Sequence, residues 1–217
     1  KLSNQNPDVL WASVGLHPTD NSKENFNIDR YKELAKLPNV VAIGECGLDY
    51  YRLPSETEII KQKEIFIKQI ELAEELDKPI ILHCRPSIRT QDAYEDTIEI
   101  LKFKNLNIPS GNGVAHFFVG SKETAKKFMD LGFYISFAGP ITFAPEYKEV
   151  VEFVPIDKIL IETDAPFASP LPHRGKRNEP TYVEFVARQI AQWKGLSFEE
   201  VARWTTENAK KIFKINQ

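Results

Sequence analysis

The sequence predicts an α/β fold built on a parallel sheet, either a doubly wound sheet or a (β/α)8 barrel. Short runs rich in Val, Ile and aromatic residues alternate with longer amphipathic stretches along the chain. The short runs are almost continuously apolar, as strands buried on both faces of a parallel sheet are. The order of strand and helix recurs six times, and this rhythm is typical of both fold types.

Six apolar runs are expected to be strands, at residues 9–16, 40–43, 80–82, 114–118, 133–137 and 159–161. Helices are expected at residues 56–76, 92–103, 121–131, 178–193 and 206–213. In the first of these, Ile59, Phe66 and Ile70 recur at helical spacing along one apolar face. Ser121 is the expected N-cap of the third helix and Gly132 marks its end. The string S-F-E-E at 197–200 is a capping box that should open a short terminal helix.

Composition indicates one domain over residues 1–217, because no linker-like, low-complexity or charge-block segment divides the chain. No apolar run approaches the roughly 18 residues that a membrane span needs. No secretory or transit segment is visible. Two cysteines, Cys46 and Cys84, are too few for a disulfide framework and suit the reducing cytoplasm, which is the expected compartment. No obligatory protein partner is indicated.

The net charge of −3 argues against a broad basic surface of the kind that non-specific nucleic-acid binders display. Any activity on nucleic acid must therefore use metal ions and a small local basic patch. The densest such patch is formed by His173, Arg174, Lys176 and Arg177.

Ionisable side chains stand where five of the apolar runs end: His17, Glu45, His83, His116 and Asp164. In parallel α/β folds the C-terminal strand ends form the active-site face, so these side chains are expected to converge there. Taken singly, a histidine after a strand is often structural, and a carboxylate is often a helix N-cap. Together they favour a metal site, because imidazole and carboxylate ligands suit Zn²⁺, Mn²⁺ and similar ions. A cation would also offset the cost of burying Glu45 beside Asp164.

Eight sequence blocks resemble the TatD family of deoxyribonucleases, in the family's order and spacing over essentially the whole chain. They are VGLHP (14–18), IGECGLDYY (43–51), KPIILHCR (78–85), HFFVG (116–120), ISFAGPITF (135–143), ETDAPF (162–167), HRGKRNEP (173–180) and ENAKKIF (207–213). The resemblance implies a TIM-type (β/α)8 barrel like that of the wider amidohydrolase group. It also implies metal-dependent hydrolysis of phosphodiester bonds in DNA, commonly as a 3′-exonuclease on single-stranded or frayed ends.

Carried over by position, the resemblance makes Glu45 a ligand shared by two divalent metal ions, which could be Zn²⁺, Mg²⁺ or Mn²⁺. His83 and His116 would hold the second ion and Asp164 the first. A carboxylate can bridge two cations, whereas a single imidazole nitrogen cannot, so the chemistry agrees. Two such ions would activate a water and neutralise charge on the phosphate, and Asp164 could act as the general base. Cys46 and Cys84, next to two of the ligands, should point away from them and be buried.

Substrate contacts are expected from Arg85, His17, Arg174 and Asn178. Arg85 lies two residues past His83, so an extended strand puts both side chains on one face, where a guanidinium suits a phosphate. An ordinary salt bridge is the alternative for Arg85. His17 could donate to phosphate, although Pro18 beside it equally marks a plain turn. Tyr50 and Tyr51 could stack on bases or simply pack.

The family pattern begins with His-x-His at the end of the first barrel strand, and no such string occurs in this sequence. The six expected strands match the third to eighth strands of the family barrel. About two βα units are therefore expected upstream, and without them the barrel should have two open apolar edges. A small-molecule hydrolase of esters, lactones or amides and a non-catalytic truncated homologue remain alternatives to a nuclease. Arg85 and the basic loop favour a phosphate substrate.

Overall fold

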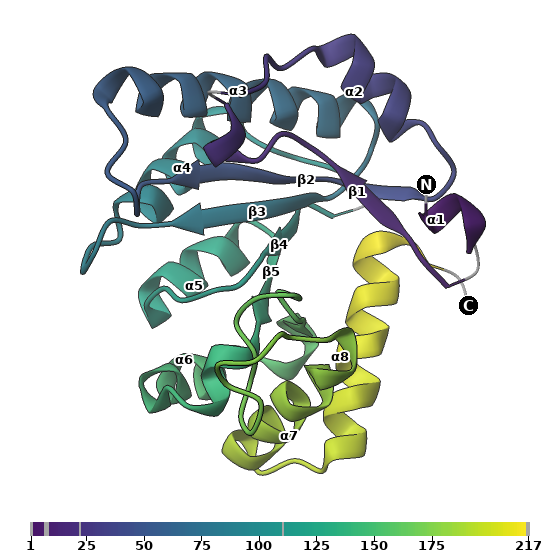
Figure 1. The fold of residues 1–217 in the computed structure, drawn as a ribbon, viewed down its shortest axis with the longest axis vertical. Helices are drawn as coiled ribbons and strands as arrows, with labels where there is room; N and C mark the ends of the chain where they lie inside the picture. The colour runs from purple at the N-terminus through teal and green to yellow at the C-terminus, as the bar shows by residue number, and fades with distance from the viewer. Residues whose placement is uncertain (1, 7–8, 22, 110, 216–217) are drawn as a thin grey trace. The chain divides into compact units, whose positions relative to one another are not determined.

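A computed structural model describes residues 2–6, 9–21, 23–109 and 111–215, drawn in Figure 1. Its six strands form one sheet in the order in which they occur along the chain. They are β1 (Ala12–Val14), β2 (Val40–Asp49), β3 (Ile80–Arg85), β4 (Gly113–Ala115), β5 (Phe133–Phe137) and β6 (Ile159–Ile161). The helices are α1 (Leu2–Gln5), α2 (Ile28–Ala35), α3 (Glu56–Glu75), α4 (Asp92–Phe103), α5 (Lys122–Asp130), α6 (Lys148–Phe153), α7 (Val183–Lys194) and α8 (Phe198–Phe213).

The predicted α/β class with a parallel sheet is confirmed. Strand β1 pairs with β2, β2 with β3, and β5 with β6, each in parallel. A sequential strand order is that of a (β/α)8 barrel, whereas a doubly wound sheet reverses its order at a switch point. The order therefore favours the barrel type over the doubly wound alternative. Closure of the sheet and the presence of further βα units stay predictions.

The described chain is divided into two compact units. The first comprises the residues up to Val114 together with 212–214, and the second comprises residues 115–211 and Ile215. The expectation of one domain over residues 1–217 therefore stays a prediction. None of the helices in the described part of the chain combines the length and apolar character that crossing a bilayer requires.

In the first unit, helix α3 packs along β2, and α2 packs against both β1 and β2 (Figure 1). A capping box fixes the start of α3: the Ser55 hydroxyl accepts from the Glu58 amide, and the Glu58 carboxylate accepts from the Ser55 amide at 2.8 Å. Strand β3 alternates, with Ile80, Leu82 and Cys84 buried while His83 and Arg85 are more exposed. This alternation sets the face on which functional side chains stand.

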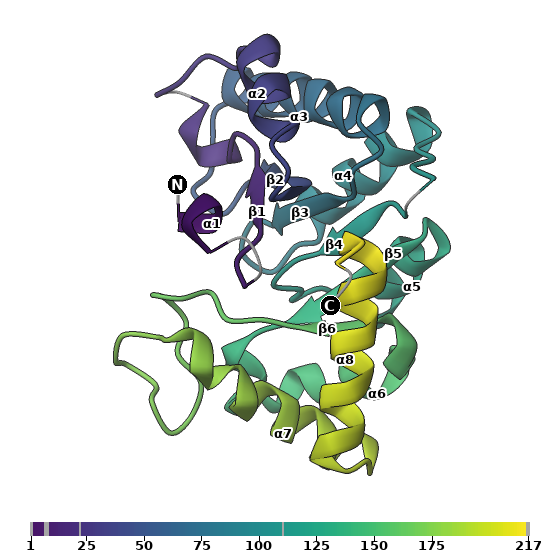
Figure 2. The same ribbon diagram turned by 90° about the vertical axis from the view of Figure 1, so that its right-hand side faces the viewer.

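In the second unit, α6 and α7 pack against each other, and α7 also contacts β6 (Figures 1 and 2). The side-chain amide of Asn208, on α8, donates to the carbonyl oxygens of Ile156 and Ile159, at 2.9 and 2.8 Å. These hydrogen bonds attach α8 to the start of β6. Ser121 caps α5 as predicted, and Gly132 follows its end with a φ of +81°.

Several expected boundaries are wrong. Strand β1 is shorter than the run 9–16, and β4 ends at Ala115, so residues 116–118 form a turn. Strands β2 and β3 are longer than the apolar runs suggested, because their polar ends remain paired in the sheet. Helix α7 begins at Val183 after the 3-10 turn Pro180–Tyr182, and the two expected C-terminal segments form the single helix α8. Helices α1, α2 and α6 were not predicted.

Candidate metal centre

Strands β2 and β3 bring Glu45 and His83 into contact. Glu45 Oε1 lies 2.5 Å from His83 Nδ1. Glu45 was expected after the end of its strand, but it lies inside β2, at a point where the β2–β3 register shifts. Gly47 is paired with His83, and a Cβ at this glycine would lie 2.1 Å from the His83 carbonyl oxygen. The absence of a side chain at Gly47 therefore lets the two strands approach closely.

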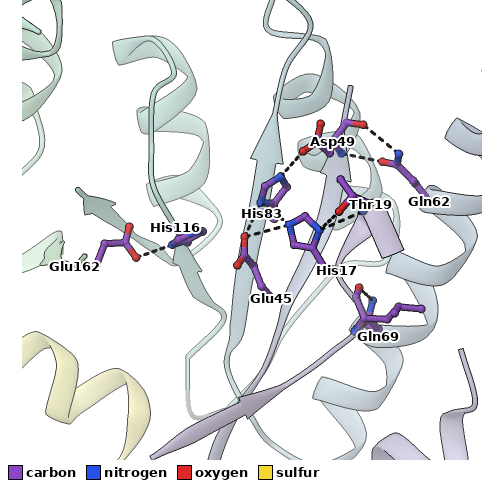
Figure 3. Close-up of polar contacts among 10 residues, drawn as sticks. His17, Thr19, Glu45, Asp49, Gln62, Gln69, His83, His116 and Glu162 are labelled. Atoms are coloured by element: carbon purple, nitrogen blue, oxygen red, sulfur yellow. Dashed lines mark hydrogen bonds and ion pairs between the residues drawn. The ribbon is translucent and has the colours of Figure 1, made fainter. Parts of the chain in front are cut away.

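His17 joins this pair from the segment that follows β1 (Figure 3). Its Nε2 lies 3.2 Å from His83 Nδ1 and 3.6 Å from Glu45 Oε1. Its Nδ1 caps the 3-10 turn Pro18–Asp20 by accepting from the Thr19 amide, and it lies 2.7 Å from the Thr19 hydroxyl. His17 therefore both begins the turn that Pro18 suggested and lies in the site. The sequence assigned His17 to substrate, whereas the structure places it beside two expected metal ligands.

The three ligand atoms fit a divalent cation. In the part of the chain that the structure describes, three side chains of metal-binding type come together. One ligand atom from each of His17, Glu45 and His83 lies within 4.8 Å of the other two. Bonds of about 2.0–2.2 Å in a tetrahedral zinc site put ligand atoms roughly 3.4 Å apart. The two distances from His17 Nε2, 3.2 and 3.6 Å, are close to this value, whereas the 2.5 Å between Glu45 and His83 is that of a hydrogen bond, which a bound cation would replace. The side chains are 28%, 33% and 15% exposed in that order, so solvent can reach the cluster.

Asp49 orients His83, a role that the sequence interpretation missed. Its side chain is 3% exposed, and its Oδ2 lies 3.0 Å from His83 Nε2. Asp49 Oδ1 also accepts from the Tyr51 amide at 3.1 Å. With Nε2 directed to Asp49, the nitrogen that faces Glu45 and His17 is Nδ1. Strand alternation from Glu45 puts Asp49 on the same face, and this spacing is the signal that could have identified it.

The electrostatics of the Asp49–His83 pair favour the charged carboxylate. Burial alone would lower the pKa of His83, but its hydrogen bonds to Asp49 and Glu45 outweigh burial and hold that pKa above its usual value. Burial would likewise raise the pKa of Asp49, yet the contact with His83 and the Tyr51 amide hold it below its usual range. Asp49 therefore remains ionised and able to accept from the imidazole.

His116 and Asp164 belong to the second unit and follow β4 and β6, as predicted. Glu162, a second residue missed from the sequence, accepts at Oε1 from the Phe117 amide at 2.5 Å and contacts His116 Nδ1 through Oε2 at 2.6 Å (Figure 3). Its place two residues before Asp164 was the available signal. Because Glu45 and His83 lie in the other unit, the convergence of all four expected ligands stays a prediction.

Arg85 occupies the exposed end of β3, on the same face as His83. Its guanidinium carbon lies 3.9 Å from the centre of the Tyr51 ring, a cation–π contact rather than the salt bridge considered from the sequence. This arrangement is compatible with the expected phosphate contact, which stays a prediction.

The basic loop after β6 holds the remaining expected substrate residues. Arg174 lies over the Phe143 ring at 4.0 Å, and His173 stacks on Tyr182 at 3.9 Å. Asn178 is 1% exposed; its amide donates to the Phe167 carbonyl oxygen at 2.6 Å and accepts from the Glu179 amide. Asn178 therefore organises the loop, and its expected contact with substrate stays a prediction.

Both cysteines are buried, as the alternation predicted. Burial raises the pKa of Cys84 to about 12 and that of Cys46 higher still. Neither thiol is therefore suited to ligation as a thiolate.

Comparisons with known proteins identify a family of metal-dependent hydrolases. The family model described as TatD related DNase matches residues 1–214. A metal-dependent hydrolase of Bacillus subtilis, YabD, is 48% identical over 96% of this chain and 79% of its own length. The 3'-5' ssDNA/RNA exonuclease TatD of a Rahnella species is 35% identical over the whole chain and 81% of its own length. The crystal structure of YJJV, a TatD homologue from Escherichia coli K12, superposes with a TM-score of 0.86 at 29% identity, covering 99% of this chain and 81% of that one. The chain therefore belongs to the TatD family of metal-dependent hydrolases.

Proposed function

We propose that this chain carries the catalytic residues of a divalent-metal-dependent nuclease that removes nucleotides from the 3′ end of single-stranded or frayed DNA. The observation that carries the proposal is the cluster of His17 Nε2, Glu45 Oε1 and His83 Nδ1, with spacings of 2.5–3.6 Å. The substrate class is taken from the Rahnella relative, whose name specifies single-stranded DNA and RNA. RNA is therefore a second substrate to be tested.

Glu45, His83, His116 and Asp164 are proposed to hold two divalent ions, with His17 as an additional ligand on the Glu45 side. Cations held there would supply Lewis-acid chemistry, lowering the pKa of a water and offsetting charge on the phosphoryl oxygens. Asp164 is the proposed general base, since a carboxylate that follows a strand end can accept a proton from the attacking water. The parts played by His116 and Asp164 rest on their positions after β4 and β6 and on the sequence blocks that contain them.

Arg85 is the proposed phosphate-binding residue. Its place on the His83 face of β3 directs a fixed positive charge toward the side of the sheet on which the ligands stand. The Tyr51 ring, 3.9 Å from the guanidinium carbon, is proposed to hold the group in place for a bidentate contact with phosphate. Arg174 is proposed as a second cationic contact. A closed TIM-type barrel and a cytoplasmic location are parts of the same proposal.

The test is cleavage of a 5′-labelled single-stranded oligonucleotide by the protein after chelation and re-addition of Mg²⁺, Mn²⁺ or Zn²⁺. The expected result is a ladder of products shortened from the 3′ end only when metal is restored. Glu45→Gln should abolish the ladder, while the exposed control Gln192→Met should retain it. Equal cleavage in excess chelator, or turnover of a small ester with no cleavage of DNA or RNA, would overturn the proposal.

A further inference from the structure

Two glutamines on helix α3 are buried against the strands that carry the metal cluster. Gln62 is 5% exposed and Gln69 is 1% exposed. They are seven residues apart, so they lie on one face of the helix, roughly 10 Å from each other along its axis. A buried carboxamide is costly unless its donor and acceptor are both satisfied. Both glutamines therefore need fixed polar partners.

Each glutamine makes the same double contact with the backbone of one residue. Gln69 Oε1 accepts from the Leu16 amide at 2.7 Å, and its Nε2 donates to the Leu16 carbonyl oxygen at 3.1 Å. Gln62 Oε1 accepts from the Asp49 amide at 2.8 Å, and its Nε2 donates to the Asp49 carbonyl oxygen at 3.1 Å. Each side chain thus supplies the pair of hydrogen bonds that a neighbouring strand would supply.

The two clamped residues adjoin the cluster directly. Leu16 precedes His17, one of the three clustered side chains, and lies beyond Val14, where the pairing of β1 with β2 ends. Asp49 contacts His83 Nε2. Figure 3 shows Gln69 and Gln62 approaching the chain segments that carry His17 and Asp49. Helix α3 therefore fixes the backbone next to His17. It also fixes the backbone of Asp49, the carboxylate that orients His83.

Gly15 makes the Gln69 contact sterically possible. A Cβ at Gly15 would lie 2.9 Å from Gln69 Oε1 and 2.8 Å from the Gly44 Cα. The glutamine amide thus reaches the backbone at a point where no larger residue fits beside it.

We infer that Gln62 and Gln69 are positioning residues of the metal centre, which hold His17 and, through Asp49, His83 in the geometry that a cation needs. The inference rests on the proposed metal site. Partners one step removed from a ligand typically change metal affinity by about 10–100-fold when they are lost. A core residue of the same helix that touches no site backbone should not have this effect.

The experiment compares Gln62→Met and Gln69→Met with two controls. Gln192→Met makes the same substitution at an exposed position on α7, and Ile70→Val weakens the buried face of α3 itself. Binding of Zn²⁺ is measured by calorimetry, and unfolding by denaturant shows that each variant is folded. Amide exchange of Leu16 and Asp49, together with the imidazole NMR signals of His17 and His83, is followed in the metal-free protein.

Gln69→Met is expected to speed exchange at Leu16, shift the His17 signals and weaken Zn²⁺ binding about tenfold or more. Gln62→Met should speed exchange at Asp49, shift the His83 signals and weaken Zn²⁺ binding to a similar extent. Both controls should leave these readouts unchanged, even though Ile70→Val lowers stability. Unchanged histidine signals in both glutamine variants, or equal changes in Ile70→Val, would overturn the inference. A wild-type protein that binds no Zn²⁺ would count against the proposed function instead, while the signals of the metal-free protein would still test the role of the glutamines.

Discussion

Glu45 Oε1 lies 2.5 Å from His83 Nδ1, although 38 residues separate them in sequence. Parallel pairing of β2 with β3 produces this contact, and Asp49 fixes which imidazole nitrogen takes part in it. The same Glu45 oxygen lies 3.6 Å from His17 Nε2. One carboxylate therefore faces two imidazoles, the arrangement expected of a ligand at the centre of a metal site.

Replacing Glu45 with Gln should remove the central charge of the cluster while keeping the size of the side chain. Zn²⁺ affinity is expected to fall by more than the roughly 10–100-fold that loss of an outer partner costs. Calorimetric titration of the metal-free protein measures this directly. The matched control is Glu184→Gln, at an exposed ion pair with Arg188 on α7. Equal Zn²⁺ affinity in Glu45→Gln and wild type would contradict the assignment.

Replacing Asp49 with Asn should disturb the tautomer of His83 without removing a ligand. An asparagine amide can donate to Nε2, which would shift the imidazole proton to Nδ1, the nitrogen that faces Glu45. Zn²⁺ affinity is expected to drop about 10–100-fold. The ¹⁵N chemical shifts of the His83 ring report the tautomer in the metal-free protein at a pH above the raised pKa of His83, where the ring is neutral. Asp130→Asn, at an exposed ion pair on α5, is the control; a His83 tautomer identical to wild type in Asp49→Asn would contradict the prediction.

The sequence predicts the parts of this fold whose signals are local. Helix α4 begins and ends where predicted, because its apolar period is clear and uninterrupted. Strand β2 was cut short at Ile43 because Gly44 and Gly47 interrupt the apolar run, although both glycines are buried in the strand. Helix α2 was missed because it is only 8 residues long and buries only Tyr31 and Ala35.

The site was only partly predictable for the same reason. Glu45 and His83 could be found because each follows an apolar run. Asp49 and Glu162 were missed, because the spacing that puts each on the face of a predicted ligand does not reveal its contact with a histidine 34 or 46 residues away in sequence. The Gln69 clamp on Leu16 spans 53 residues and leaves no local pattern at all. Residues that position ligands are thus harder to predict than the ligands themselves.

Replacing Arg85 with Ala should weaken substrate use while leaving metal binding intact. A guanidinium offers no lone pair to a cation, and a hydrogen bond to a charged group contributes about 1.5–3 kcal/mol. KM for a single-stranded oligonucleotide is therefore expected to rise about tenfold or more, with Zn²⁺ affinity unchanged. Tyr51→Leu should have a smaller effect in the same direction, because it removes only the ring that orients the guanidinium. Lost Zn²⁺ affinity with a normal KM in Arg85→Ala would show that Arg85 is structural.

Replacing His116 with Ala should abolish metal-dependent cleavage and leave the fold intact. The side chain is 13% exposed and its Nδ1 is directed to Glu162, so its loss removes a proposed ligand and not a large core residue. Removing a ligand of a catalytic ion forfeits several kcal/mol of transition-state stabilisation, which corresponds to a fall in kcat/KM of about 10³-fold or more. Cleavage assays with Mn²⁺ and Zn²⁺ measure the loss, and urea unfolding checks stability.

Glu162→Gln is the companion variant: it keeps an acceptor for the Phe117 amide but weakens the hold on His116, so activity should fall by less. Full activity in His116→Ala would show that His116 has no role in the proposed mechanism.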